Sequence, residues 1–513
     1  MGALAAARVI ESFDGLGQGF TGPQGRAVLR NPSDNTLAVG RDHIVQIVNS
    51  RLAIFARAGS RYDSTGRVLY GPVPTNTVFR GAGGACEARN SGDAVVRHDQ
   101  LADRWLIVMP VFQRSVWRAD DPVAPRAGEP AVASRPVRRG QPGAAVPLFV
   151  PAPVNDSVAP RPPAPRDSGA YAMCYAISAT ADPLGSYYRY EFVRPLFPDY
   201  PRPAVWPDGY YVPTSTGDDV IEKHACVVDR ARMLRGEEAS EQCVVIADVN
   251  FLNNVDLDGT VLPPDGAPNI MLAAGGSQLR HRLQDSVLLA WTFHVDWSDI
   301  ARTTVSGPTA IAVAPYHYLC NGQLTNCVPQ PGTDRRLDAQ GDKLMARVVY
   351  RRIGARESIV AVHSVDAGTS GGVRWYELLV ERDRTLRVAQ QGTYAPDSSF
   401  RWMGSPVIDR FGNIGIGYSF GGTPFFAGQR FAARRRSDPP GQLTLREQVL
   451  IDGGAAQTTT LRWQDYTQTA VDPRDDCTIW YVGDYLRAGS AGYSSRIGAF
   501  RMPGCTGKSA RLP

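Results

Sequence analysis

The chain has 513 residues, of which 43% are hydrophobic and 20% are charged. This composition supports a large packed core and excludes global disorder. The formal net charge is only +5, and no long basic helix or aromatic-interleaved basic stripe accompanies it, so we expect no nucleic-acid partner. No apolar stretch reaches the length of a membrane span, so we also expect no transmembrane segment.

The chain opens with MGALAAARVIESF, a segment with a short apolar stretch and without the basic leader of a signal peptide. We therefore expect a mature sequence from which a signal has been removed. The cysteines are even in number and form no C-x-x-C motif, which predicts a disulfide framework. Disulfides require an oxidising compartment, so we expect a secreted or cell-surface protein, extracellular or periplasmic. The cysteines are Cys86, Cys174, Cys226, Cys243, Cys320, Cys327, Cys477 and Cys505.

Strand-like runs dominate the chain from its first fifty residues onward. Each is rich in β-branched or aromatic residues and ends near Gly, Asp, Asn or Pro, whereas no long segment keeps a helical period. A weak repeat accompanies them, in which an apolar strand, an Asp-containing turn and a second apolar strand follow one another. The repeat predicts the first hairpin of a four-stranded blade, because radial repetition of such blades buries both faces of each sheet. Clear copies span residues 93–108, 204–215, 405–419 and 469–483.

Counting the hairpins, with weaker copies included, gives seven, so we predict an all-β fold in which residues 1–513 form a single seven-bladed β-propeller. The last blade has room for only three strands after residue 467, and the run 7–13 belongs to no early hairpin. We therefore expect residues 7–13 to supply its fourth strand and close the ring, and a Cys477–Cys505 bridge to lock that blade. Residues 506–513 are expected to be a flexible tail. The first strands are expected near Thr36, Asp93, Pro203, Pro268, Asp342, Gly404 and Thr467.

Residues 113–168 interrupt the pattern, because they are rich in Pro, Ala and Arg. Such a composition favours extended chain over a packed core. The segment falls between the second and third strands of the second blade, and propeller geometry directs a loop at that position to the face that usually binds ligands. We interpret it as a disordered insertion or, alternatively, as a lid or partner-binding arm.

Several long segments resemble a bacterial family of secreted seven-bladed β-propellers that is loosely termed sialidase-like and whose activity is largely undefined. The resemblance covers nearly the whole chain apart from the insertion, and it implies the fold rather than a reaction. We do not expect sialidase activity, because the R-I-P motif is absent and the turn at 364–375 places Trp375 too late for the S-x-D-x-G-x-T-W pattern. The resembling segments are 199–212, 327–338, 390–419 and 462–505.

The segment NVDLDG at 254–259 suggests a metal site. Asn254, Asp256 and Asp258 alternate, and Asp265 falls where a calcium loop places its last carboxylate. Hard oxygen ligands at alternating positions suit Ca²⁺. An ordinary Asx-rich turn is the alternative interpretation, because no helices flank the segment.

The loops that enter the first strand of each blade are expected to converge around the central channel, and they carry carboxylates, arginines and aromatic side chains. This combination suits recognition of a glycan or a protein partner, which is our leading hypothesis. Paired carboxylates suggest a carbohydrate-active enzyme, either hydrolase or lyase, as the alternative, and a structural cell-surface component is the third possibility. The same residues could instead tie neighbouring blades together, and the oligomeric state stays open. The candidate ligand-binding residues are Asp93, Tyr200, Arg202, Arg401, Trp402, Arg462, Asp465 and Tyr466.

Overall fold

The computed structural model confirms the predicted all-β class. In the residues that the structure describes, the helical elements are short, the longest being α2 (Arg230–Arg235), with α1 (Gly84–Ala88) before it. None of the helices within the described part of the chain is long and apolar enough to cross a membrane. The structure describes residues 2–113, 132–134, 138–139, 146–147, 171–215, 222–249, 251–274, 286–322 and 326–506.

The first sheet shows the unit from which the fold is built. Four antiparallel strands follow one another in chain order, and the first of them is completely buried. Apolar β-branched residues fill these strands, and short turns with Gly, Asp or Asn separate them. The same meander recurs near the C-terminus. The strands of the first unit are β4 (Thr36–Val39), β5 (His43–Val48), β6 (Arg51–Ala56) and β7 (Val68–Pro74). Those of the later unit are β29 (Phe400–Ile408), β30 (Ile414–Gly422), β31 (Phe425–Arg434) and β32 (Gln448–Ile451).

The second and third sheets repeat this order and carry the insertion. Within the insertion, β10 (Val132–Ser134) pairs with β18, whereas β11 (Arg138–Arg139) and β12 (Val146–Pro147) pair with β14. The rest of the 113–168 segment, except Gln113, lies outside the described residues. The second sheet contains β8 (Val95–Asp99), β9 (Arg104–Val111), β13 (Tyr171–Ser178) and β14 (Ser186–Arg194). The third contains β15 (Ala204–Val205), β16 (Gly209–Ser215), β17 (Lys223–Asp229) and β18 (Glu241–Ile246).

The fourth and fifth units are joined, because their first strands β19 and β25 pair in parallel through Val255–Leu257 and Val348–Tyr350. A hairpin of β23 (Asn326–Gln330) and β24 (Thr333–Asp338) lies between the two units in sequence. The fourth unit contains β19 (Asn253–Leu257), β20 (Asn269–Ala274), β21 (Val287–His294) and β22 (Thr304–Ala312). The fifth contains β25 (Val348–Ile353), β26 (Arg356–Asp366), β27 (Gly371–Val380) and β28 (Leu386–Tyr394).

The last sheet combines both ends of the chain. Its C-terminal strands are β33 (Gln468–Val471), β34 (Thr478–Tyr485) and β35 (Ser494–Arg501). The fourth strand is β1 (Arg8–Asp14), which pairs antiparallel with β35 from Arg8↔Arg501 to Asp14↔Arg496. The strand order β1-β35-β34-β33 therefore places the N-terminal strand at the outer edge of the C-terminal sheet.

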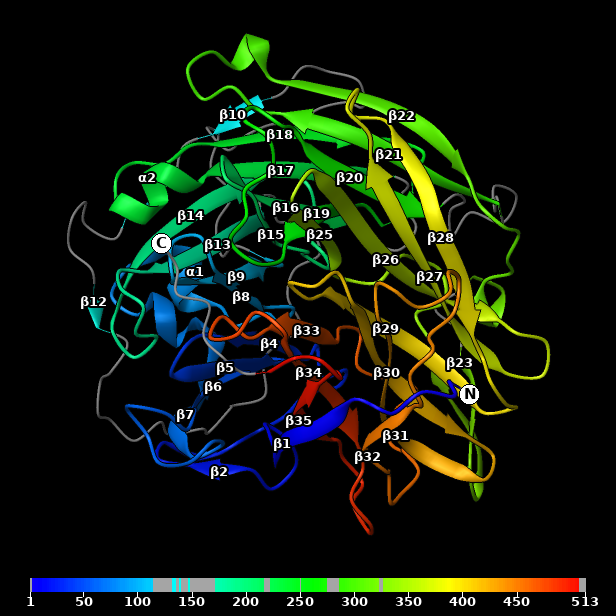
Figure 1. Cartoon of the computed structure of the whole chain (residues 1–513). Helices are drawn as coiled ribbons and strands as arrows, with labels where there is room; N and C mark the ends of the chain where they lie inside the picture. The colour runs from blue at the N-terminus through cyan, green and yellow to red at the C-terminus, as the bar shows by residue number, and fades with distance from the viewer. Residues whose placement is uncertain are drawn as a thin grey trace.

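The sheets succeed one another around a common centre, which is the architecture of a β-propeller (Figure 1). Their first strands lie nearest this centre, and the later strands of each unit lie farther out (Figure 1). The main chain is held in this arrangement by a core between adjacent sheets, in which six tryptophans are almost completely buried. Each first strand contacts the first strand of the next unit, and the last one contacts the first. The contacting pairs are β4–β8, β8–β15, β15–β19, β19–β25, β25–β29, β29–β33 and β33–β4.

All eight cysteines form disulfides, as the sequence predicts. Cys477 precedes β34 and Cys505 follows β35, so their bridge fastens the chain end to the last sheet. The other bridges are Cys86–Cys174, Cys226–Cys243 and Cys320–Cys327.

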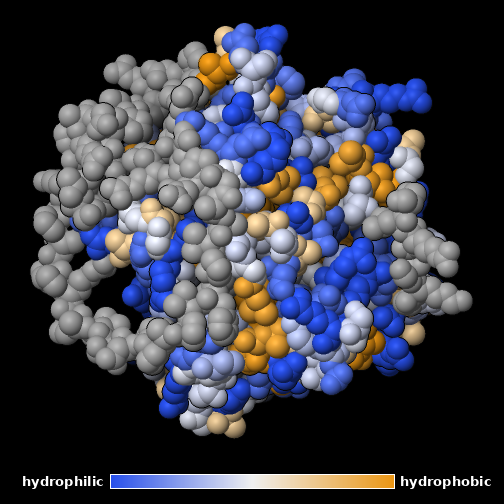
Figure 2. All heavy atoms as spheres, turned by 90° about the vertical axis from the view of Figure 1, so that its left-hand side faces the viewer, coloured by the Kyte–Doolittle hydropathy of each residue, from blue (hydrophilic) through white to orange (hydrophobic). Residues whose placement is uncertain are grey.

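On the face shown in Figure 2, hydrophobic residues form small patches separated by hydrophilic ones. Only a few large apolar side chains are exposed among the described residues, at scattered positions such as Val261, Phe411 and Phe425. Scattered single residues of this kind are normal on a soluble surface. The search for a site therefore turns to the cavities.

Candidate functional site

The segments that enter the first strands meet at one end of the propeller axis and enclose a cavity of about 280 Å³, which we call the axial cavity. Its walls combine carboxylates, a lysine, an arginine and aromatic rings contributed by most of the sheets. Its lining residues are Pro32, Asp93, Phe197, Asp199, Tyr200, Phe251, Gln340, Lys343, Arg462 and Asp465.

A left-handed backbone conformation recurs in these entering segments. Non-glycine residues with positive φ, between 38° and 67°, lie just before five of the first strands, and a sixth lies inside the first strand β29. This conformation costs a non-glycine residue on the order of 1 kcal/mol or more, and it persists only where the surroundings enforce it. The repeat is a property of the backbone that the residue types do not reveal. The six residues are Asp34, Asp93, Tyr200, Phe251, Met403 and Asp465.

Hydrogen bonds between neighbouring sheets enforce these turns. The Asp34 amide donates to the Gln464 carbonyl at 2.7 Å. The Asp93 amide donates to Asp34 Oδ2, and the Tyr200 amide donates to Asp93 Oδ2, both at 3.3 Å. The last, first, second and third sheets are thereby linked in a chain, so Asp34 and Asp93 do tie blades together. Asp93 in addition faces the cavity.

The carboxyl groups of Asp93 and Asp465 differ in proton affinity. Burial, reinforced by the charge of Asp199, raises the pKa of Asp93 to about 8. Burial also raises the pKa of Asp465, but Arg462 and Lys343 oppose it and hold the value at about 6. At neutral pH the cavity therefore presents a protonated and an ionised carboxyl group, the combination that acid–base catalysis requires.

Two cations face these acids. Lys343 Nζ lies 3.9 Å from the centre of the Phe251 ring and 3.1 Å from Asp342 Oδ1. Arg462 Nε donates to Asp338 Oδ2 at 3.0 Å, and the guanidinium also pairs with Asp465. The Arg462 side chain is 45% exposed, so it is a charged group that a ligand can reach directly.

Of the aromatic residues predicted for ligand stacking, Tyr200 lines the cavity and Tyr466 packs against Tyr200. Tyr200 and Tyr466 stack on each other with ring centres 4.2 Å apart, and both are buried. Arg202 packs over the Tyr200 ring and donates Nε to the Leu252 carbonyl at 2.7 Å. Its Nη1 and Nη2 are buried without a protein acceptor. Buried donors normally have a partner, so these two groups are available to water or a ligand.

An aromatic cluster that the sequence did not single out stands at the cavity rim. Phe197 lines the cavity and is partly exposed. Its ring centre lies 4.8 Å from that of Phe112 and 5.3 Å from that of Tyr171. Phe112 follows β9 and Tyr171 begins β13, so the two ends of the insertion flank this rim. Phe197 therefore offers an apolar surface directly beside the carboxylates.

The structure gathers six of the eight predicted ligand-binding residues at or under the axial cavity, and it separates Arg401 and Trp402 from them. Both residues lie inside β29 rather than before it, because this strand begins earlier relative to its turn. Arg401 is held by Asp397 and Glu447 at 2.9 and 2.7 Å, and Trp402 packs in the core. Neither residue lines the axial cavity, so the structure does not group them with the other six, and their role in ligand binding stays a prediction. The six gathered residues are Asp93, Tyr200, Arg202, Arg462, Asp465 and Tyr466.

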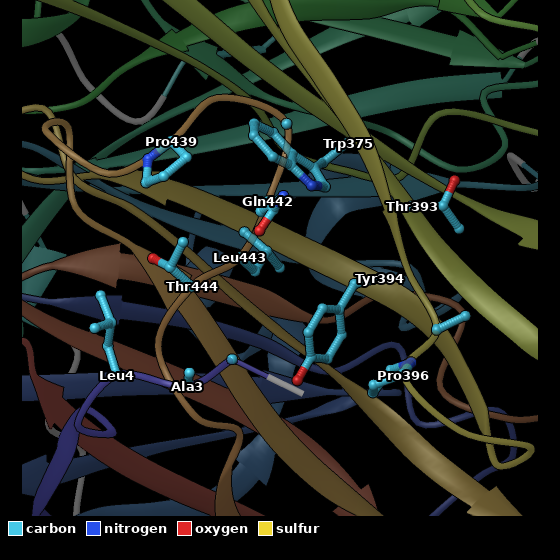
Figure 3. Close-up of a pocket in the computed structure, with 13 residues that line it drawn as sticks. Ala3, Leu4, Trp375, Thr393, Tyr394, Pro396, Pro439, Gln442, Leu443 and Thr444 are labelled. Carbon is cyan, nitrogen blue, oxygen red and sulfur yellow. The ribbon is translucent and has the colours of Figure 1, made fainter.

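A larger cavity of about 460 Å³ lies elsewhere, between the N-terminal segment and the fifth and sixth sheets. Figure 3 shows the Tyr394 ring projecting into it, with Leu4 and Ala3 along one side. Among the described residues that line this cavity there is no carboxylate, lysine or arginine. It lacks the charged groups that orient a polar ligand, so we place the candidate site in the axial cavity.

The predicted calcium ligands do not fit a calcium site. Asp256 lies in β19 and pairs with Arg347 at 2.7 Å, and Asp258 pairs with the same guanidinium. Asn254 donates to Asn269 Oδ1 at 2.8 Å, and Asp265 lies in an exposed turn. The carboxylates thus have an arginine as counter-ion. Across the described ranges, the clusters of metal-type ligands contain Cys226 with Cys243 or Cys477 with Cys505, which are bonded to each other.

No family model and no curated protein sequence matches this chain. Among solved structures, it is similar to the N-terminal domain of Nup159, with 8% identity, a TM-score of 0.35, and coverage of 97% of this chain and 96% of that one. It is also similar to the NanB sialidase from Streptococcus pneumoniae (10% identity, TM-score 0.37, 75% and 64% coverage). A protein of unknown function from Dyadobacter fermentans gives 10% identity, a TM-score of 0.36, and coverage of 97% and 100%. These similarities are too distant to carry a function, so the assignment of the fold rests on the sheets themselves.

Proposed function

We propose that this chain is an extracellular or periplasmic seven-bladed β-propeller that binds the end of a glycan in its axial cavity. The blade count is supported by the seven meanders of four strands, counting β1 with the last. Ring closure is supported by the contact of β33 with β4, which completes the circle of first strands, and by the pairing of β1 with β35. The location is supported by the four disulfides.

The observation that carries the choice of ligand is the partly exposed Phe197 ring beside Asp93 and Asp199 in one small cavity. A sugar ring has an apolar C–H face that stacks on an aromatic ring and hydroxyl groups that donate to carboxylates. The cavity volume of about 280 Å³ lies just below the lower limit of about 300 Å³ for typical small-molecule pockets. It therefore suits one sugar residue at the end of a longer chain. Arg462 adds a donor that a sugar oxygen can reach.

A protein partner is less well supported, because protein interfaces are broad and bury roughly 800 Å² on each partner. The axial cavity is narrow and polar instead. A purely structural role would depend on packing of the 113–168 segment against a neighbouring subunit, and most of that segment lies outside the described residues.

The proposal is tested by presenting the purified chain to an array of plant, bacterial and animal glycans and then measuring the affinity for each glycan that binds. We expect Phe197→Ala to weaken binding about fivefold, because aromatic stacking contributes about 1 kcal/mol. Phe411→Ala is the matched control, since Phe411 is an exposed phenylalanine in the turn between β29 and β30. The absence of any bound glycan, or equal affinities for the wild type and Phe197→Ala, would overturn the proposal.

A further inference from the structure

We propose that the axial cavity also hydrolyses the glycosidic bond of the glycan it holds, with Asp93 as the proton donor and Asp465 as the base. This inference rests on the proposed glycan-binding function and adds a reaction to it. Both side chains line the same cavity, and they come from segments that precede different first strands, β8 and β33. A sugar in the cavity would therefore lie beside both carboxyl groups.

Both carboxyl groups are held in place by hydrogen bonds to the surrounding protein. Asp93 Oδ2 accepts the Tyr200 amide at 3.3 Å. Asp465 Oδ1 accepts Gln340 Nε2 at 2.9 Å, and the other oxygen pairs with Arg462. Fixed orientation of this kind is what lets a catalytic group act without reorganisation in the transition state.

The tie between blades does not by itself explain why residue 93 is an aspartic acid. An asparagine carbonyl would accept the Tyr200 amide equally well, and it would avoid burying an acid beside Asp34 and Asp199. Burying two neighbouring carboxyl groups is costly unless one of them keeps its proton. The hydrogen bond to Tyr200 therefore does not require an acid at residue 93, whereas proton donation does.

The surrounding charges give Asp93 and Asp465 the different protonation states that the reaction needs. Asp93 has a pKa of about 8, and Asp465 has a pKa of about 6. Between these values Asp93 keeps its proton while Asp465 is ionised, which assigns acid and base. The titratable and charged groups that act on Asp93 are Asp34, Asp199, Asp465 and Tyr466, and those that act on Asp465 are Arg462, Lys343, Asp199, Asp338 and Asp34.

The step is a balanced hydrolysis with water as the co-reactant. Asp93 transfers its carboxyl proton to the glycosidic oxygen, and the bond between that oxygen and the anomeric carbon breaks with its electron pair on the oxygen. A water oxygen bonds to the anomeric carbon, and the Asp465 carboxylate accepts the water proton. The products are two hydroxyl-bearing sugars, and the two carboxyl groups return to their starting states by proton exchange with solvent.

The test uses the full chain and the glycans that it binds on the array, with a panel of 4-nitrophenyl α- and β-glycosides as further probes. Released reducing ends or nitrophenol report turnover, and equilibrium binding is measured separately. We expect Asp93→Asn and Asp465→Asn each to lower turnover at least 100-fold, the usual range for loss of a general acid or base, while affinity changes less than threefold. Asp383→Asn, an exposed aspartate in the turn after β27, is the matched control and should keep full activity.

The pH profile of the wild type tests the same assignment without any variant. Turnover should fall below about pH 6 and above about pH 8, as the pKa values of Asp465 and Asp93 require. Binding of a glycan that is never cleaved would overturn the inference and leave the proposed function standing. Parallel losses of binding and turnover in Asp93→Asn would also overturn it. Failure to bind any glycan would overturn both proposals.

Discussion

Replacement of Asp93 by asparagine should change how the stability of the protein depends on pH. Burial raises the pKa of Asp93 from 3.8 to about 8 in the folded state. Between these values the folded chain keeps a proton that the unfolded chain has released. Stability supplied by the buried acid is therefore complete below about pH 4 and is lost as the pH rises toward 8.

The magnitude follows from this shift. Each pKa unit corresponds to about 1.36 kcal/mol, so three units between pH 5 and pH 8 give about 4 kcal/mol. An asparagine stays neutral and keeps the acceptor for the Tyr200 amide. The decrease in unfolding free energy from pH 5 to pH 8 should thus be about 4 kcal/mol smaller in Asp93→Asn than in the wild type.

The assay is urea denaturation followed by tryptophan fluorescence at the two pH values. Asp383→Asn is the control, because Asp383 is exposed and hydrogen bonds to Thr385 lower the pKa of its carboxyl group. A lowered pKa keeps this carboxyl group ionised at both pH values, so the variant should follow the wild type. Equal decreases in stability for the wild type and Asp93→Asn would refute the claim that residue 93 is protonated in the folded protein at pH 7.

Three further substitutions test the packing around the site. Arg347→Gln leaves Asp258 buried without its paired arginine and leaves Asp256 with only Arg97, so denaturation should show a loss of about 3–5 kcal/mol; added Ca²⁺ should not restore it, and rescue by Ca²⁺ would reinstate a calcium site. Cys477→Ser with Cys505→Ser opens a loop spanning 28 residues, which should lower the unfolding free energy by about 3.5 kcal/mol, and an unchanged value would show that the bridge does not stabilise the last sheet. Gly417→Ala places a Cβ 2.3 Å from the Tyr481 ring, so its melting temperature should fall in line with an overpacking cost of about 1–3 kcal/mol; an unchanged melting temperature would contradict the close approach of the two sheets.

Local sequence patterns predicted the strands and the disulfide framework well. The predicted hairpins 93–108 and 405–419 combine β-branched residues with flanking turn residues, and they coincide with the observed hairpins β8–β9 and β29–β30. The apolar run 7–13 belongs to no early hairpin and was therefore predicted to join the last sheet, where β1 does pair with β35. These features depend on neighbours in sequence or on composition, which a single chain displays directly.

The partners of buried charges could not be predicted in the same way. Asp256 and Asp258 look like calcium ligands in sequence, but their counter-ion Arg347 lies about 90 residues away and reaches them only because β19 and β25 are adjacent. The position of Arg401 and Trp402 was also not predicted. They precede an Asp-containing hairpin as the other candidates do, but a bulge between Trp402 and Ser405 changes where β29 begins.

Composition offered one unused signal for the site. Lysine occurs only at 223, 343 and 508 in a chain that otherwise uses arginine. Lys343 lines the axial cavity, and Lys223 lies 5.3 Å from the Phe251 ring in the same centre. Burial and Arg202 lower the pKa of Lys223 to about 8. Burial can bring the pKa of a lysine toward neutral pH, but not that of an arginine. The two rare lysines therefore mark the region of the axial cavity, where Lys223 is a cation whose charge can change. Phe197 and Gln340 carried no comparable signal.

Amide hydrogen exchange of the segment Arg8–Asp14 tests the closed seven-bladed arrangement most directly. If this strand completes the C-terminal sheet, the amides that it pairs with β35 should exchange as slowly as those of β34 and β35 themselves, because all of them open only with the same sheet. Exchange of the segment within seconds, while β34 and β35 stay protected, would show that the ring is not held shut by the N-terminal strand.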